Sequence, residues 1–172
     1  MEILIENSQV RLALTKVQDL DFVVMAEGDD ENSDFVGQWP LDQHMQAISD
    51  EDVLHLVIKD AKNKSVGFVI IRGLLNSNDS IELMRIVVAD KGKGYGRQVL
   101  KLVKRWCFEV QGAHRLWLDV LDHNVRAQHL YKSESFVCEG VLRESDKYEG
   151  VYHSQLIMSI LKKEYQAASG NR

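Results

Sequence analysis

The chain has 172 residues, a formal net charge of −5 at pH 7 and 45% hydrophobic residues. These values are typical of one globular domain with a hydrophobic core, and we expect a single domain over residues 1–172 with residues 8–165 structured. The acidic charge argues against a general nucleic-acid-binding protein. The chain has neither a signal-peptide pattern nor an apolar run of the ~20 residues that span a bilayer, so we expect a cytoplasmic protein without a nucleic-acid or membrane partner.

The first half of the chain predicts a strand, two short helices and a three-stranded meander. Val10–Val17 alternates apolar and polar residues, as a strand does. A helix is expected to follow and to end near Gly28, and a second one to begin at Pro40. Turn residues then separate three β-rich runs, which are Val53–Asp60, Lys64–Leu75 and Ser80–Ala89. Antiparallel pairing in a meander is the simplest connection for these three runs.

The second half predicts one βαβ unit and a closing hairpin. Apolar residues at helical spacing follow Tyr95, and Gly112 is a suitable helix stop. His114–Leu121 is a buried type of strand, so the strand before this helix and the strand after it should lie parallel. A further helix is expected over 124–133, followed by two strands, 136–145 and 150–161, around a turn at Glu149. The fold class is therefore α+β.

A glycine-rich stretch, "DKGKGYGRQVLKLVKRW" from Asp90 to Trp106, joins the third meander strand to this helix. A helix N-terminus exposes unpaired N–H groups and the positive end of the helix dipole, and glycine lets a phosphate approach the backbone closely. Gly92, Gly94 and Gly96 therefore favour a phosphate-bearing cofactor over a merely flexible turn. Their spacing does not match GxGxxG or GxxxxGK[ST], which excludes the two common nucleotide-binding loops.

Two motifs carry a resemblance to the GNAT superfamily of N-acetyltransferases. The stretch from Lys91 to Gly96 resembles the family's pyrophosphate-binding signature Q/R-x-x-G-x-G/A, with Lys91 in place of Gln or Arg. Asn124–Phe136 resembles the family's segment N-x-x-A-x-x-L-Y-x-x-x-G-F, with Ser135 in place of the glycine. The tail, Glu139–Tyr165, is similar to the subgroup that contains the ribosomal-protein alanine acetyltransferases and the spermidine acetyltransferases.

This resemblance implies a mixed, mostly antiparallel sheet with a splayed central parallel strand pair and helices on both faces. It also implies acetyl-CoA as the cofactor, with coenzyme A as a product. The backbone N–H groups of Ile86 and Val88 would then contact the pantetheine arm and the thioester carbonyl. The cofactor-binding residues implied in this way are Ile86, Val87, Val88, Lys91, Gly92, Lys93, Gly94, Tyr95, Gly96, Arg97, Asn124, Ala127 and Tyr131.

Two residues are candidates for the proton transfers. Tyr131 matches the tyrosine that protonates the leaving thiolate in the family, and its alternative is a helix tyrosine buried by its ring. Glu82 shares side-chain parity with Met84 and Ile86 unless a bulge resets the register, so it would face the acceptor and act as the base. Its alternative is a surface glutamate at the start of a strand. Asn124 either contacts pantetheine or caps a helix.

The acceptor is less well specified. Phe35 and Trp39 are expected to line its pocket, with core packing as the alternative, and the nearby acids from Asp29 to Asp34 are more typical of a solvated loop. Deprotonating an α-amine of pKa ~7.7–8.0 at pH 7 costs about 1 kcal/mol, whereas a lysine-like amine costs about 4.6 kcal/mol. We therefore expect a peptide N-terminus as the acceptor, with a polyamine or another small amine as the alternative.

Other classes of function and other ligands remain to be considered. A non-catalytic acyl-CoA sensor is the main alternative of another class, a nucleotide-binding regulator is a third interpretation, and a homodimer is left open. His114, His123 and His129 do not have the spacing of a helical metal-ligand pair, so no metal is expected. Cys107 and Cys138 are expected to be buried, reduced thiols.

Overall fold

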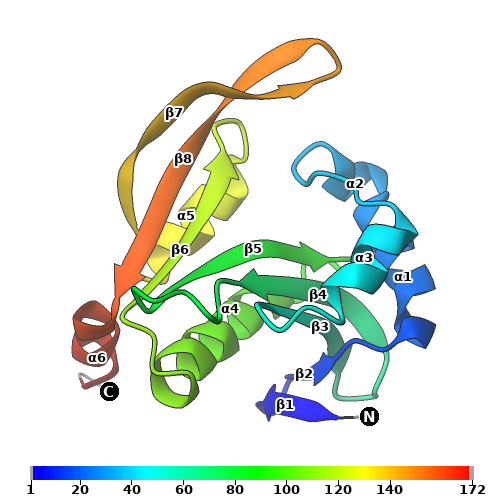
Figure 1. Cartoon of the computed structure of the whole chain (residues 1–172), viewed down its shortest axis with the longest axis horizontal. Coiled ribbons are helices and arrows are strands. Elements are labelled where there is room, and N and C mark those ends of the chain that lie inside the picture. Colours follow the sequence, from blue (N-terminus) through cyan, green and yellow to red (C-terminus); the bar gives the residue numbers. More distant parts are fainter. Residues whose placement is uncertain (1, 171–172) are drawn as a thin grey trace.

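The computed structural model describes residues 2–170, which form one eight-stranded sheet with helices on both faces (Figure 1). The strand order is β1-β2-β3-β4-β5-β6-β8-β7, and every neighbouring pair is antiparallel except β5 and β6. The strands are β1 (Ile3–Glu6), β2 (Val10–Leu14), β3 (Val53–Asp60), β4 (Ser65–Arg72), β5 (Ser80–Val88), β6 (Arg115–Leu121), β7 (Val137–Tyr148) and β8 (Val151–Leu161). The predicted α+β class, the meander and the parallel pair are confirmed.

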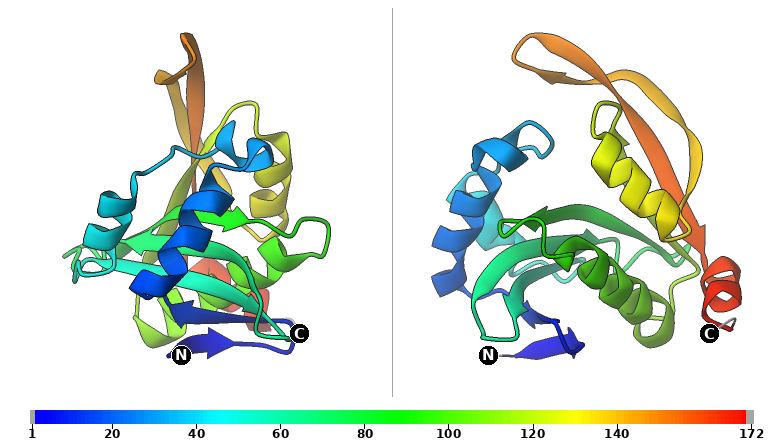
Figure 2. Two further views of the ribbon diagram at one scale, coloured as in Figure 1. Left: turned by 90° about the vertical axis from the view of Figure 1, so that its right-hand side faces the viewer. Right: turned by 180° about the vertical axis from the view of Figure 1, so that it is seen from behind.

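The sheet separates the hydrophobic core into two parts, and helices cover each of them (Figure 2). The buried faces of α4 and α5 pack on one side of the sheet, and α1 with the segment leading to α3 packs on the other. The helices are α1 (Leu20–Glu27), α2 (Asp30–Ser33), α3 (Leu41–Ala47), α4 (Tyr95–Arg105), α5 (Val125–Ser133) and α6 (Lys162–Gly170), with a 3-10 turn at Val17–Asp19 and a π turn at Trp106–Val110. Hydrophobic residues at helical spacing thus cover both faces of the sheet, as expected.

The parallel strands β5 and β6 are paired only at one end. Their register covers Ser80–Glu82 opposite Arg115–Trp117. Beyond that point β5 continues to pair with β4, and β6 continues to pair with β8. Backbone groups on the β6-facing edge of β5 therefore have no strand partner in the described chain past Glu82, and the splayed pair that the resemblance implied is present.

A β-bulge interrupts β5 at Met84. Ile70 pairs with Arg85, but the next residue of β4, Ile71, pairs with Leu83. An extra residue in one strand exchanges the faces of the residues that follow it. The predicted parity of Glu82 with Ile86 was therefore wrong, because the bulge lies between them.

A buried polar network links α1, α3 and the sheet. One carboxylate oxygen of Glu27 pairs with Arg85, and the other accepts hydrogen bonds from the backbone N–H of Trp39 at 2.7 Å and from His44 Nε2 at 3.3 Å. His44 Nδ1 lies 3.1 Å from Nε2 of His55. Burial, followed by the charge of His44, lowers the pKa of His55 to about 4, so this ring is neutral near pH 7.

Several elements differ from the sequence-based expectations. The structured part extends beyond residues 8–165, because β1 and α6 lie at the two ends, and the acidic segment before Phe35 contains the short helix α2. β7 continues to Tyr148. Cys107 is buried as expected, but Cys138 is exposed, because it lies on the edge strand β7. Among the helices of the described residues, none combines the length and the apolar character that crossing a membrane requires.

Candidate active site

A cleft of about 1620 Å³ opens where β5 and β6 diverge. Its walls come from the α2 segment, the bulged part of β5, the glycine loop, the end of β6, α5 and the turn region of the β7–β8 hairpin. Of the predicted site residues, Phe35, Glu82, Ile86, Val88, Lys91, Gly92, Gly94, Tyr95, Gly96, Arg97, Asn124, Ala127 and Tyr131 line it. The two sequence motifs are thus brought together around one space.

Three predicted site residues do not line this cleft. Val87 is 1% exposed and packs in the core beneath α1, because residues on either side of it in the strand face the other way. Lys93 is exposed and pairs with Asp90 at 2.8 Å. Trp39 packs in the same core as Val87, with the Arg85 guanidinium 4.6 Å from the centre of its ring. Core packing, the alternative for Trp39, is what the structure shows.

The glycine loop has the backbone geometry of an anion cradle. Gly92 and Gly94 have φ of 80° and 75°, and a Cβ at either position would meet nothing within 4 Å. Glycine is therefore favoured here by the left-handed backbone rather than by lack of space. Helix α4 begins at Tyr95, and the N–H groups of its first turn have no acceptor within the helix.

Basic side chains of this loop are held by acids of the chain. Lys91 Nζ pairs with the Glu31 carboxylate at 3.3 Å and donates to the Glu31 carbonyl oxygen at 2.6 Å, which ties the loop to α2 across the cleft. Arg97, in the first turn of α4, pairs with Glu134 at 2.7 Å. Such partly exposed pairs contribute only about 0–1 kcal/mol, so a phosphate can compete with the acid for the same cation.

Tyr131 reaches the cleft from α5 and is 7% exposed. Its ring packs 5.8 Å from that of Phe136, and within residues 2–170 no group forms a hydrogen bond with its hydroxyl. Burial, with a further contribution from the Asp119 carboxylate, raises the pKa of Tyr131 above its usual range. The phenol therefore keeps its proton at neutral pH and is available as a donor in the cleft.

The start and the end of α5 follow the capping rules that its motif predicts. The side-chain oxygen of Asn124 accepts a hydrogen bond from the Ala127 N–H at 3.2 Å, so Asn124 caps the helix. Ser135, which replaces the motif's glycine, has φ of 73°. That left-handed conformation is the physical reason for a glycine at this position in the motif.

Acidic side chains gather at the other end of the cleft. Glu82 is 5% exposed, and both of its oxygens are engaged by Arg72, from Nη2 at 3.1 Å and from Nε. Burial, followed by the Glu82 carboxylate, raises the pKa of Asp119, with Asp146 acting in the same direction and Arg72 opposing it. Neither Asp119 nor Asp146 forms an ion pair in the described part of the chain.

Sequence reasoning missed Asp119 and Asp146. Asp119 is the one acid of β6, and Asp146 lies in β7, which the sequence-based strand did not reach. The parallel pairing of β5 with β6 brings Asp119 close to Glu82, and the sheet order β6-β8-β7 brings Asp146 to the same cleft. A lone acid in an otherwise apolar strand was the available signal for Asp119.

Phe35 is the one of the two predicted aromatic residues that reaches the cleft. It lines the cleft and packs against His123 with ring centres 5.4 Å apart. His123 is grouped with Asp122 and His153, not with the two other histidines considered in the sequence.

The chain matches known proteins over most of its length. The model of the acetyltransferase (GNAT) family matches residues 20–136. A spermidine N(1)-acetyltransferase of Vibrio cholerae is 29% identical over 119 residues, which is 69% of each chain. The structure of spermidine N-acetyltransferase from the same organism in complex with CoA and spermine superposes with a TM-score of 0.84 at 26% identity, covering 93% of this chain and 99% of the other. A dodecameric structure of that enzyme gives 0.80 at 25% identity, covering 95% and 99%.

Proposed function

The chain belongs to the acetyltransferase (GNAT) family and is an acetyl-CoA-dependent N-acetyltransferase, and we propose that its acceptor is a polyamine. The observation that carries this proposal is the acidic end of the cleft, where the carboxylate of Asp119 lies near those of Glu82 and Asp146 and has no ion pair of its own among the described residues. Their mutual repulsion is relieved by a bound cation. Relatives named for spermidine support the same acceptor class.

This acceptor corrects the expectation of a peptide N-terminus. That expectation rested on the cost of deprotonating the amine, about 4.6 kcal/mol for a lysine-like group at pH 7. It assumed Glu82 as the only base, because Asp119 was not recognised as part of the site. A second carboxylate in the cleft gives the proton of the more basic amine an additional acceptor, directly or through water.

We place acetyl-CoA along the splayed strands. The pyrophosphate would bind the N–H groups at the start of α4, where Gly92 and Gly94 leave the backbone open. The pantetheine arm would bind the unpaired edge of β5 through the backbone of Ile86 and Val88. This placement directs the thioester toward Tyr131 and the acids, all of which line the same cleft.

The reaction then needs two proton transfers. The neutral amine attacks the thioester carbonyl, a C–N bond forms, and the C–S bond breaks. Tyr131 donates its proton to the departing thiolate, and Asp119 accepts the proton that the amine loses, directly or through water. Glu82 is less suited than Asp119 to accepting this proton, because Arg72 engages both of its oxygens.

Family membership favours an enzyme over the acyl-CoA sensor and the nucleotide-binding regulator. The homodimer, which the sequence left open, remains untested. Exposed apolar side chains on the β7–β8 edge, among them Val137, Val141 and Tyr152, support association between copies. A dodecamer is the assembly named for one relative.

Replacing Asp119 with Asn is expected to raise the KM for spermidine about 10- to 100-fold, because one charge-assisted contact is worth about 1.5–3 kcal/mol. It should also lower kcat by about 10²- to 10⁴-fold, because the amide cannot accept the proton that the amine loses. The KM for acetyl-CoA should stay unchanged, since the residue lies at the acceptor end. Release of free coenzyme A thiol measures both constants. Asp21→Asn is the matched control, because it removes the same charge from an exposed position of α1 that lies outside the cleft. An unchanged spermidine KM in Asp119→Asn would remove the acidic cluster from the acceptor site.

A further inference from the structure

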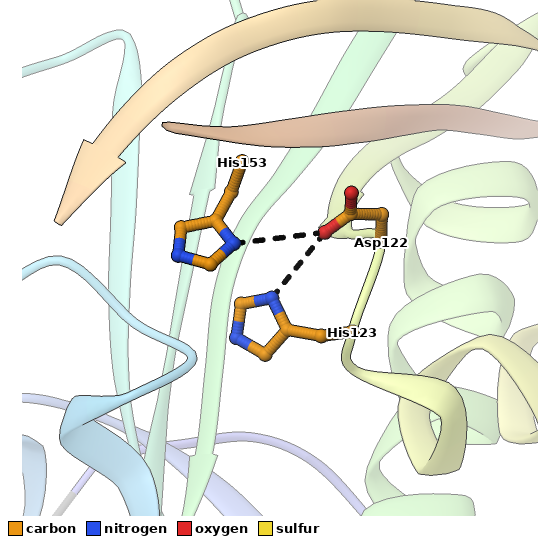
Figure 3. Close-up of side chains that lie close together, drawn as sticks. All are labelled: Asp122, His123 and His153. Carbon is orange, nitrogen blue, oxygen red and sulfur yellow. Dashed lines mark hydrogen bonds and ion pairs between the residues drawn. The ribbon is translucent and has the colours of Figure 1, made fainter. Parts of the chain in front are cut away.

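Three side chains with metal-ligand chemistry meet at the rim of the cleft (Figure 3). Asp122 and His123 follow β6, and His153 lies in β8. Asp122 Oδ1 is 3.3 Å from Nδ1 of His123 and 3.9 Å from Nδ1 of His153. The ligand atoms of all three residues lie within 4.8 Å of one another, and the two rings are 4.5 Å apart at their centres. Ligand atoms from the loop after β6 and from β8 thus lie close together.

Backbone hydrogen bonds hold this arrangement. The N–H of Asp122 donates to the Ser154 carbonyl at 2.9 Å, and the N–H of Ser154 donates to Asp122 Oδ2 at 3.3 Å. These two bonds fix the end of β6 against β8 beside His153. The second bond also occupies Oδ2 of the carboxylate, and Oδ1 is turned toward the two imidazoles, as Figure 3 shows.

The second nitrogen of His123 indicates which tautomer the ring adopts. Nε2 lies 3.3 Å from the carbonyl oxygen of Asp34, which can only accept a hydrogen bond, so Nε2 carries the hydrogen. In the neutral ring, Nδ1 then presents a lone pair to a carboxylate oxygen. A positive charge between the two atoms stabilises this arrangement, whether it is a proton on Nδ1 or a metal ion that both atoms bind. The contact from His153, at 3.9 Å, is too long to be a hydrogen bond.

We propose that Asp122, His123 and His153 bind one divalent transition-metal ion and that Zn²⁺ is the best match. Two imidazoles and one carboxylate suit zinc, whereas Mg²⁺ and Ca²⁺ prefer oxygen ligands. Ligands ~2.1 Å from a tetrahedral ion are about 3.4 Å apart, and Asp122 Oδ1 lies at comparable distances of 3.3 Å and 3.9 Å from the two imidazole nitrogens. A metal-bound histidine commonly donates its other N–H to a carbonyl, as His123 does to Asp34.

This site was not expected from the sequence, which predicted no metal. His153 lies 30 residues beyond His123, in another strand, so spacing could not reveal the cluster. A bound ion would join the β6–α5 loop to β8 and to the segment before α3. The inference is independent of the proposed acceptor, because no step of acetyl transfer uses the ion.

Calorimetric titration of the untagged, chelator-treated chain with Zn²⁺ tests the proposal. We expect saturable binding of one ion per chain, and His153→Gln should weaken it by more than about 10-fold. His114→Gln is the matched control, because His114 is exposed and outside the cluster, and it should bind as the unaltered chain does. All variants carry Cys138→Ser, since the exposed thiol could bind zinc on its own. Binding that persists in His153→Gln, or no saturable binding in the control, would overturn the proposal.

A second readout separates loss of the site from loss of the fold. Co²⁺ should give the visible absorption of a four-coordinate ion in the control and not in His153→Gln. Zn²⁺ should raise the thermal midpoint of the control by several degrees, because it binds the folded state, and should leave that of His153→Gln unchanged. Without the ion, both variants should unfold at the same temperature. An equal zinc-induced shift in both would contradict the assignment.

Discussion

Replacing Tyr131 with Phe is expected to lower kcat for acetyl transfer by about 10²- to 10⁴-fold, the usual contribution of a positioned general acid. The hydroxyl lies in the cleft without a partner in the described chain, and burial keeps it protonated. Without this proton, the thiolate of coenzyme A has to leave as an anion in a partly dry site. The KM for either substrate should change little, since the ring remains in place.

Single-turnover release of coenzyme A thiol measures this effect. The fold should be unaffected, because phenylalanine preserves the packing against Phe136 and no hydrogen bond is removed. Tyr152→Phe is the matched control, since Tyr152 is exposed and lies outside the cleft. Full turnover in Tyr131→Phe would show that water or another group protonates the thiolate, and Tyr131 would then be a packing residue.

Glu27→Ala is expected to lower the free energy of unfolding by about 3–5 kcal/mol, which would be the largest effect on stability among the changes considered. Glu27 is 1% exposed and balances the buried guanidinium of Arg85. Removing the carboxylate leaves that charge unpaired and also leaves the N–H of Trp39 and His44 Nε2 without an acceptor. Each buried group left in this way adds to the cost.

Urea unfolding of Glu27→Ala and of the unaltered protein at pH 7 gives the difference in unfolding free energy directly. Glu6→Ala is the control, because its ion pair with Arg11 at 2.9 Å lies on the surface and should contribute no more than about 1 kcal/mol. An equally small loss of unfolding free energy in Glu27→Ala and Glu6→Ala would mean that water or a rearranged side chain compensates the charge of Arg85. The buried network would then not be a source of stability.

Local patterns were sufficient to predict much of this fold. Alternating residues predicted the meander, and the glycines before an amphipathic helix predicted the phosphate cradle, because each feature depends on neighbours in the chain. Tyr131 could be identified from its motif for the same reason. The short terminal elements β1 and α6 were missed, since each packs on the core through only a few residues and carries no strong local pattern.

The acceptor end could not be predicted from local patterns. The bulge at Met84 changes the face of every later residue of β5, and only the pairing with β4 reveals it. Asp146 and His153 become neighbours of the site through the order β6-β8-β7, which residue spacing does not encode, whereas Asp119 follows from the β5–β6 pair. Interpreting the acceptor from Glu82 alone therefore favoured a peptide N-terminus over the polyamine that we propose.

The proposed polyamine acceptor can be tested by comparing two pools of acceptors. The enzyme is given acetyl-CoA with spermidine or spermine in one series and with a mixture of N-terminal peptides in another, and free coenzyme A thiol is followed. Polyamines should accelerate its release strongly, whereas peptides should leave it near the rate without acceptor. Faster release with peptides, or no acceleration in either series while acetyl-CoA is bound, would contradict a polyamine acetyltransferase.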